Sequence, residues 1–437
     1  MKHTLLYVFT AAILLSMTGC KLEQKNLFDE SAAERLQIQE QTIRTYLTSA
    51  VNGWEMLYFP YPDAAGYAFL MQFEADGSVK IAAKNSISSK NMYQEETSLW
   101  GMDGTQGCVL TFHSYNNLFS VFADPGSDGI GHSGDYEFFV LSDATENQIR
   151  LKGKKHKAYV MMNKLADNLD WKTYFDKIDY YNAEIFDDND GIDMLFWDGE
   201  SEIKMTYDEG TFTYEKDGEE QTRGFIITPT GVHFYSGFLM ADSVTYAKDF
   251  DLAEDKQTLK TEDGRAFISS SYSAADFFAY KFSKYSRWFY VEEGTDAQTQ
   301  NAVKAIHDKA LAKGANINNI AYERTESVNG RGIVTYTYAL YIAYMVENKV
   351  FGGRITMTFQ QTGDQVTLSY RSYDKTLDPL LARLADTTSE ATAMFSDIFC
   401  GTFTPKSYSG SGLNMTQLLL DGENGKAIHV KADKIIL

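Results

Sequence analysis

Carboxylates form the densest cluster of chemically active side chains in the sequence, at Asp187, Asp188, Asp190 and Asp193. Calcium prefers oxygen ligands of this kind. An EF-hand loop with Gly191 in sixth place, however, would need Asp at residue 186 and Glu at residue 197, where the sequence has Phe and Trp. A loose calcium site is therefore the only cofactor that the sequence suggests, and a solvated acidic turn between a helix and a strand is the preferred interpretation.

Histidine and serine residues lack the spacing of the common hydrolase motifs. No two histidines after residue 20 stand four apart, as they would in a His-Glu-x-x-His zinc helix. Gly131-His132-Ser133-Gly134 lacks the second spacer of the G-x-S-x-G nucleophile elbow. A hydrolase whose two carboxylates meet only in the folded chain stays open, because glycoside cleavage needs no local motif.

Tryptophans near expected loops or strand ends are the remaining candidates for a ligand site: Trp100, Trp197 and Trp288. Sugar-binding proteins stack pyranose rings on exposed aromatic side chains. The alternative is core packing, since each large aromatic side chain buries about 150–250 Å². The three tryptophans are therefore candidate ligand-binding residues, with burial in the core as the competing interpretation.

The N-terminus carries the pattern of a bacterial lipoprotein signal. A basic tip at Lys2, an apolar run over residues 5–17 and the small pair Thr18-Gly19 precede Cys20. This pattern predicts a signal peptide over residues 1–19, lipidation of Cys20 and a membrane tether through the lipid. An ordinary signal peptide with a coincidental cysteine is the alternative. The expected location is the outer membrane, at the cell surface or else facing the periplasm.

Composition excludes several other classes of protein. The formal net charge of −20 would repel nucleic acid, so no nucleic-acid partner is expected. Aromatic residues make up 14% of the chain and prolines number only 6, a mixture that suits strands better than an all-helical fold. Cys108 and Cys400 remain after the lipobox, and the sequence leaves open whether they pair or are buried as free thiols.

The elements that must position these residues alternate between helices and groups of short strands. Ser31-Ala32-Ala33-Glu34 is a capping box and predicts a helix whose apolar stripe runs on to Trp54. Further helices are expected over residues 170–185, 295–313 and 378–399. Between these helices, apolar residues recur at every second position in short runs that are separated by turn residues. These runs predict strands and include residues 67–74, 78–84, 118–123, 135–141 and 148–153.

These patterns predict an α+β fold, mainly antiparallel β, with barrel- or sandwich-like strand units that each follow a helix. The expected units are the signal peptide at residues 1–19, a helix and antiparallel β unit at 20–165, a helix and second β unit at 166–290, and a long-stranded unit with two helices at 291–437.

Several stretches of the first unit are similar to a known family. They are residues 27–35 after Cys20, Gly53-Trp54, residues 122–125 and 134–138 on either side of a glycine-rich loop, and residues 151–155. They resemble a domain-of-unknown-function family of Bacteroidota lipoproteins encoded beside SusC/SusD-type outer-membrane uptake systems. The resemblance implies an accessory role in nutrient capture and a possible SusC/SusD-type partner, and it transfers no catalytic residue.

The sequence therefore predicts a lipid-anchored extracytoplasmic accessory or binding protein of a glycan or peptide uptake system. Binding is favoured over catalysis because no complete catalytic constellation is present. The alternatives are the hydrolase with a non-local carboxylate pair and a structural subunit of a surface complex.

Overall fold

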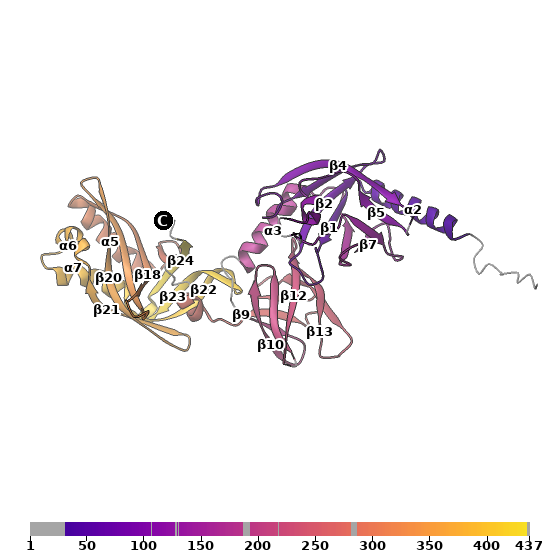
Figure 1. The fold of residues 1–437 in the computed structure, drawn as a ribbon. Coiled ribbons are helices and arrows are strands. Elements are labelled where there is room, and N and C mark those ends of the chain that lie inside the picture. Colours follow the sequence, from indigo (N-terminus) through magenta and orange to yellow (C-terminus); the bar gives the residue numbers. More distant parts are fainter. Residues whose placement is uncertain are drawn as a thin grey trace, which may run out of the picture.

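The described residues form three closed antiparallel barrels of eight strands each, which follow one another in sequence (Figure 1). The computed structural model describes residues 31–434 except 106, 127, 128, 130, 187–192, 217 and 281–285. The α+β, mainly antiparallel class with barrel-like units is therefore confirmed. Within the described part of the chain, no helix is long and apolar enough to cross a membrane. Cys20 lies outside the described residues.

The first barrel follows α2 (Ala32–Ser49), the helix predicted from the capping box. Glu34 N donates to Ser31 Oγ at 3.2 Å, and Ser31 N donates to the Glu34 carboxylate at 2.8 Å. The strands are β1 (Trp54–Tyr58), β2 (Tyr67–Phe73), β3 (Ser78–Ala83), β4 (Gln94–Asp103), β5 (Val109–Phe112), β6 (Glu137–Val140), β7 (Gln148–Gly153) and β8 (Tyr159–Lys164).

The second barrel follows α3 (Trp171–Ile185), whose first turn is capped by the Asp170 side chain. Trp171, Tyr174 and Phe175 of this helix are buried against the outside of the first barrel. The strands are β9 (Asp193–Trp197), β10 (Glu202–Asp208), β11 (Thr211–Lys216), β12 (Glu219–Ile227), β13 (Gly231–Leu239), β14 (Tyr246–Leu252), β15 (Thr258–Lys260) and β16 (Phe267–Ser270).

The third barrel follows the short helix α4 (Ala274–Tyr280), and further helices lie between its strands in the sequence. Its first strand, Ser286–Val291, spans the predicted unit boundary between residues 290 and 291 and pairs with both its second and its last strand. The elements are β17 (Ser286–Val291), α5 (Ala297–Ala312), β18 (Ala315–Val328), β19 (Val334–Val346), β20 (Lys349–Thr362), β21 (Gln365–Tyr373), η2 (Lys375–Leu377), α6 (Asp378–Leu384), α7 (Thr388–Phe399), β22 (Gly401–Ser411), β23 (Asn414–Gly422), η3 (Glu423–Gly425) and β24 (Ala427–Lys434).

Three predicted elements differ from the structure. Trp54 is the first residue of β1 and not part of the first helix, because the helix ends at Ser49 with Ala50 in an extended conformation, and a turn with Gly53 at a φ of 79° leads into the strand. The strand predicted over residues 118–123 is a turn with the 3-10 helix η1 (Ser120–Ala123), held by Asn116 side-chain contacts. The helix predicted over residues 378–399 is two helices, because Thr387 caps a new start.

Alternate positions of each strand fill the barrel interior with large apolar side chains. In β2, Phe69, Met71 and Phe73 are buried in the first core, where the Tyr58 and Phe119 rings meet edge-on at 5.2 Å. Equivalent sets fill the second and third barrels. The interiors are therefore packed cores, and sites for ligands have to lie on the outside or at the barrel ends.

Neighbouring barrels are joined by direct contacts. Between the first and second barrels, Leu57, Phe59 and Ile226 form a shared apolar cluster, and Gly66 N donates to Phe225 O at 3.1 Å. Between the second and third, the turn from β22 to β23 places Leu413, fully buried, in the core of the second barrel. The third barrel therefore supplies part of the second core.

Candidate functional site

Two of the three candidate tryptophans are buried in barrel cores. Trp100 is 3% exposed, lies edge-on to Phe73 at 5.0 Å and donates its indole N–H to Glu74 O at 3.2 Å. Trp288 is completely buried, stacks on Phe278 and donates to that residue's carbonyl oxygen at 2.9 Å. Neither ring is accessible for stacking on a sugar, so the structure places both in the competing role of core packing.

Trp197 differs because it lines a cavity at one end of the second barrel. Its ring is half-buried and lies nearly parallel to Phe267 at 6.1 Å. The cavity holds about 440 Å³ and adjoins another of about 530 Å³, and both are lined by Met240 and Arg265. Tyr246, 61% exposed, lines the second cavity. The two cavities together are called the Arg265 groove below.

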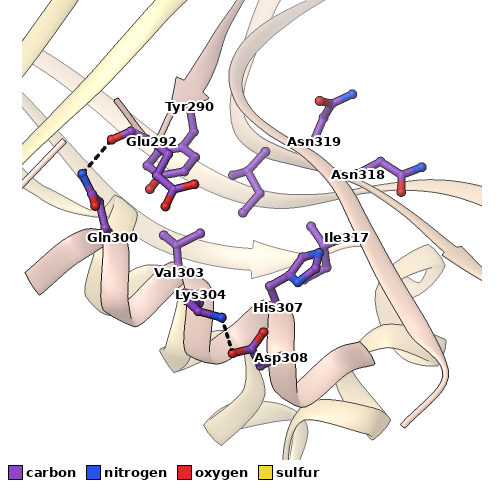
Figure 2. Close-up of a pocket in the computed structure, with 11 residues that line it drawn as sticks. Tyr290, Glu292, Gln300, Val303, Lys304, His307, Asp308, Ile317, Asn318 and Asn319 are labelled. Atoms are coloured by element: carbon purple, nitrogen blue, oxygen red, sulfur yellow. Dashed lines mark hydrogen bonds and ion pairs between the residues drawn. The ribbon is translucent and has the colours of Figure 1, made fainter. Parts of the chain in front are cut away.

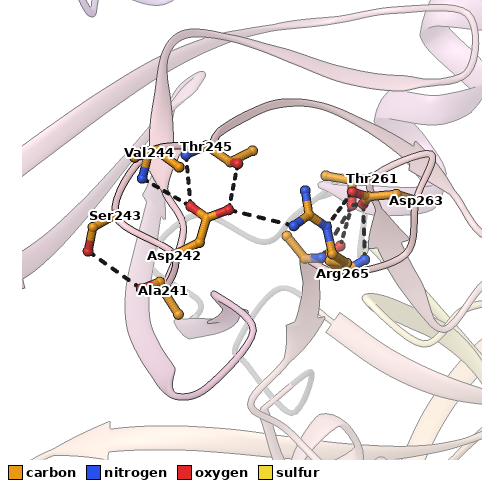
Figure 3. Close-up of polar contacts among 9 residues, drawn as sticks. Ala241, Asp242, Ser243, Val244, Thr245, Thr261, Asp263 and Arg265 are labelled. Carbon is orange, nitrogen blue, oxygen red and sulfur yellow. Dashed lines mark hydrogen bonds and ion pairs between the residues drawn. The ribbon is translucent and has the colours of Figure 1, made fainter.

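Arg265 is held between two carboxylates in this groove (Figure 3). Its Nε donates to Asp263 Oδ2 at 2.6 Å, and its Nη1 lies 3.6 Å from Asp242 Oδ2. Asp242 also accepts from the Thr245 amide at 2.8 Å and from the Val244 amide at 3.0 Å. The guanidinium is thus fixed by two turns, the one after β13 and the one between β15 and β16.

These contacts keep both carboxylates ionised. Hydrogen bonds from the Thr245 side chain and backbone lower the pKa of Asp242 to about 2. Hydrogen bonds from the Thr261 hydroxyl and from Arg265 lower the pKa of Asp263 to about 2. A glycosidase needs one carboxylic acid with a raised pKa as proton donor. Asp242 and Asp263 therefore suit hydrogen-bond acceptance and not general acid catalysis.

The acidic cluster gives no metal centre in the described residues. Asp187, Asp188 and Asp190 lie outside them, and Asp193 begins β9. Asp193 Oδ1 accepts from the Thr206 hydroxyl at 2.8 Å, and Oδ2 pairs with Lys204 Nζ at 2.5 Å. No group of three or more His, Cys, Asp or Glu side chains that could hold a metal ion is found in the part of the chain that the structure describes.

A separate cavity, of about 450 Å³, lies on the third barrel between α5 and the strands β17 and β18 (Figure 2). One end carries Tyr290, Glu292 and Gln300, and the side along α5 carries Lys304 and Asp308, which form an ion pair at 2.7 Å. No sequence pattern indicated this cavity, because its lining residues come mainly from three separate elements, β17, α5 and β18.

One motif residue of the first unit, Asp135, has a structural role. The Asp135 carboxylate accepts from the backbone amides of Lys155 and His156, both at 2.8 Å. Its own amide donates to the Tyr58 hydroxyl at 2.9 Å. Asp135 therefore ties the turn between β7 and β8 to the barrel.

Sequence reasoning missed Arg265, Asp242 and Asp263. Asp263-Gly264 and Asp242-Ser243 are turn signals, and φ values of 68° at Gly264 and 60° at Ser243 agree with turns. Asp242 and Asp263 are 21 residues apart in the chain, and their turns meet because β13 to β16 pair in sequence order, which places alternate turns at the same end of the barrel. A turn signal alone does not indicate a ligand site.

Comparison with solved structures gives only remote similarities. A DNA polymerase sliding clamp from Pseudomonas aeruginosa is 10% identical, with 93% of this chain and 98% of that chain covered and a TM-score of 0.13. A DNA polymerase III subunit beta from Pseudomonas aeruginosa is 8% identical, with 92% and 98% covered and a TM-score of 0.14. Scores of this size carry no inference about fold or function. Comparison with curated proteins finds no match.

One family model matches the chain. It is described as a domain of unknown function, DUF4302, and it matches residues 24–252, which is more than half of the 437 residues. The matched segment contains α2, the first barrel, α3 and the strands β9 to β14. The chain therefore belongs to the DUF4302 family of domains of unknown function.

Proposed function

We propose that the protein is a lipid-anchored binding protein of an extracytoplasmic nutrient uptake system, and that it binds a neutral oligosaccharide in the Arg265 groove. The lipobox at Cys20 supports the anchor. The similarity of the N-terminal motifs to Bacteroidota lipoproteins encoded beside SusC/SusD-type systems supports the role in uptake at the outer membrane. The observation that carries the binding site is the fixed Arg265, which stands between a tryptophan-lined and a tyrosine-lined cavity.

The chemistry of the groove favours a polyhydroxylated ligand. Trp197 and Tyr246 offer aromatic surface, while Asp242 and Asp263 offer ionised oxygen atoms that accept hydrogen bonds from hydroxyl groups. Acidic side chains outnumber basic ones among the lining residues. An anionic glycan would be repelled by them, so a neutral one is the better fit.

The low pKa values of Asp242 and Asp263 favour binding over hydrolysis. The two carboxylates closest to Arg265 have pKa values lowered to about 2, and neither could donate a proton to a leaving group at neutral pH. Ionised carboxylates in fixed positions are suited to orienting hydroxyl groups. The ligand should therefore be released unchanged.

The test is calorimetric titration of the chain from residue 21, which lacks the lipid, with neutral oligosaccharides of glucose, mannose, galactose and xylose. Oligogalacturonate serves as the anionic comparison. Arg265→Ala should weaken binding about tenfold or more, since hydrogen bonds to charged groups contribute about 1.5–3 kcal/mol. Trp197→Ala should also weaken binding.

Arg150→Ala is the matched control. Arg150 is 53% exposed and paired with Asp143 on the first barrel, and Arg265 is 55% exposed. The control should leave affinity unchanged. No binding of any neutral oligosaccharide, or equal affinity in the Arg265 and Arg150 variants, would contradict the proposal.

A further inference from the structure

We infer that the cavity between α5 and β17–β18 of the third barrel is a second binding site, which takes a primary ammonium group on an aliphatic chain. A lysine side chain of a peptide and a free alkylamine share this chemistry. The inference is independent of the Arg265 groove, which lies on another barrel.

One end of the cavity presents hydrogen-bond acceptors (Figure 2). Gln300 Nε2 donates to the backbone oxygens of Glu292 at 2.9 Å and of Thr295 at 2.7 Å. Both amide hydrogens are thus used, and the orientation of the amide is fixed with its oxygen as the group left over. The Gln300 side-chain oxygen accepts no hydrogen bond from any residue that the structure describes.

Two further groups lie at the same end. The Tyr290 hydroxyl is buried near Thr295 and forms no hydrogen bond of normal distance and angle with the described residues. Burial, followed by the negative charge of Glu292, raises the pKa of Tyr290 to about 12. The Glu292 carboxylate forms no ion pair or hydrogen bond with the described residues. A donor-rich ligand would satisfy all three groups, and an ammonium group has three N–H donors.

The charge of the cavity has the sign that a cation requires. Lys304 and Asp308 neutralise each other at 2.7 Å. Glu292 is left as the uncompensated charge among the lining residues when His307 is neutral. An anionic ligand would face this carboxylate, whereas an ammonium group would pair with it.

The remaining wall is suited to a hydrocarbon chain. Val303, Ile317 and Ile320 line the cavity beside the polar end. Burying the CH₂ groups of a ligand against such side chains favours binding. The combination of an acceptor end and an aliphatic wall distinguishes an alkylammonium ligand from both a sugar and an inorganic cation.

The test uses pentylammonium as the probe and pentan-1-ol as its neutral counterpart, with binding followed by ligand-observed NMR on the full chain from residue 21. Pentylammonium should bind at least about tenfold more tightly than pentan-1-ol. Glu292→Gln should remove that preference. Glu293→Gln, the same change at the neighbouring residue, which does not line the cavity, should keep it.

Tyr290→Phe separates a binding role from a structural one. The hydroxyl has no hydrogen bond of normal distance and angle to lose among the described residues, so this variant should unfold at the same temperature as the wild type or higher, while its affinity for pentylammonium falls. Equal affinity for the amine and the alcohol, or equal loss in the Glu292 and Glu293 variants, would overturn the inference. The amine test and the oligosaccharide titration of the Arg265 groove probe different barrels. One can therefore fail while the other succeeds, so this inference and the proposed function are tested separately.

Discussion

Asp242 illustrates how one turn residue can fix both a local structure and a site. Its carboxylate accepts from two backbone amides and from the Thr245 hydroxyl at 2.6 Å, and it also faces Arg265. Asparagine would keep the shape of this side chain and part of its hydrogen bonding, but not the charge. The contribution of the charge can therefore be measured by that single change.

A pH dependence follows for Asp242. Because its pKa in the folded state, about 2, is lower than the ordinary value of 3.8, the ionised carboxylate stabilises the fold above about pH 4, and this contribution is lost as the pH falls towards 2. Asp242→Asn should lower the Tm at pH 7. The difference in Tm from the wild type should shrink between about pH 5 and pH 2.5 in calorimetric scans. A difference that stays constant over this range would contradict the assignment.

Glu323 is a buried carboxylate that joins two arginines on the third barrel. It is 1% exposed, and it pairs with Arg287 at 2.7 Å and with Arg354, while Arg287 lies 3.6 Å over the Tyr341 ring. Removing one partner of a buried ion pair costs about 3–5 kcal/mol when the other charge stays buried. Arg354 is about one-third exposed, so water can take over part of its solvation.

Glu323→Ala should therefore lower the free energy of unfolding by about 2–3 kcal/mol. Glu326→Ala is the control, because Glu326 lies on the same strand, is exposed and should change stability by no more than about 0.5 kcal/mol. Denaturation by guanidinium gives both values. Equal, small changes would mean that the arginines are satisfied without Glu323.

At the scale of elements, the turn between β22 and β23 of the third barrel packs into the second barrel. Gly412 N donates to Lys256 O at 2.7 Å, Asn414 Nδ2 donates to Ala183 O at 2.8 Å, and Leu413 between them is fully buried in the second core. Leu→Ala substitutions in cores cost about 2–5 kcal/mol. Leu413→Ala should destabilise the second barrel by that amount, although the residue belongs to a hairpin of the third.

Hydrogen exchange would locate the effect of this change. Faster exchange is expected in peptides from β9 to β16, with less change in the first barrel. Leu311→Ala is the control, since Leu311 on α5 is 55% exposed. Faster exchange confined to the third barrel would contradict the role of Leu413 in the second core.

Local signals predicted most elements, and the exceptions have physical reasons. Helices α2, α3 and α5 begin at side-chain caps, which the sequence displays directly. Residues 118–123 alternate as a strand would, but Asn116 draws the chain into a turn. Trp197 lies at the end of β9, as the sequence predicted. Arg265 could not be predicted as its neighbour in the groove, because the two residues are brought together by the pairing of β9 with β16, which are far apart in the sequence.

At the scale of the whole molecule, the segment that matches the family model ends before the last two strands of the second barrel. The match stops at residue 252, the last residue of β14, while β15 and β16 close the second barrel. A chain cut after residue 252 would leave the edges of β9 and β14 without partners, and open edges promote aggregation. A chain cut after residue 280 would keep both barrels closed.

The fragment 31–280 should therefore remain monomeric and folded, with a second barrel weakened by the absence of Leu413, whereas the fragment 31–252 should aggregate or lose protection in β9 to β14. Size-exclusion chromatography and hydrogen exchange of the two fragments give the comparison. Equal behaviour would mean that β15 and β16 are dispensable for closure.

The position of Leu413 also makes the second barrel depend on the last part of the chain. All eight strands of the second barrel precede the residue that completes its core. A premature stop codon before this residue would therefore weaken a barrel whose strands are all present.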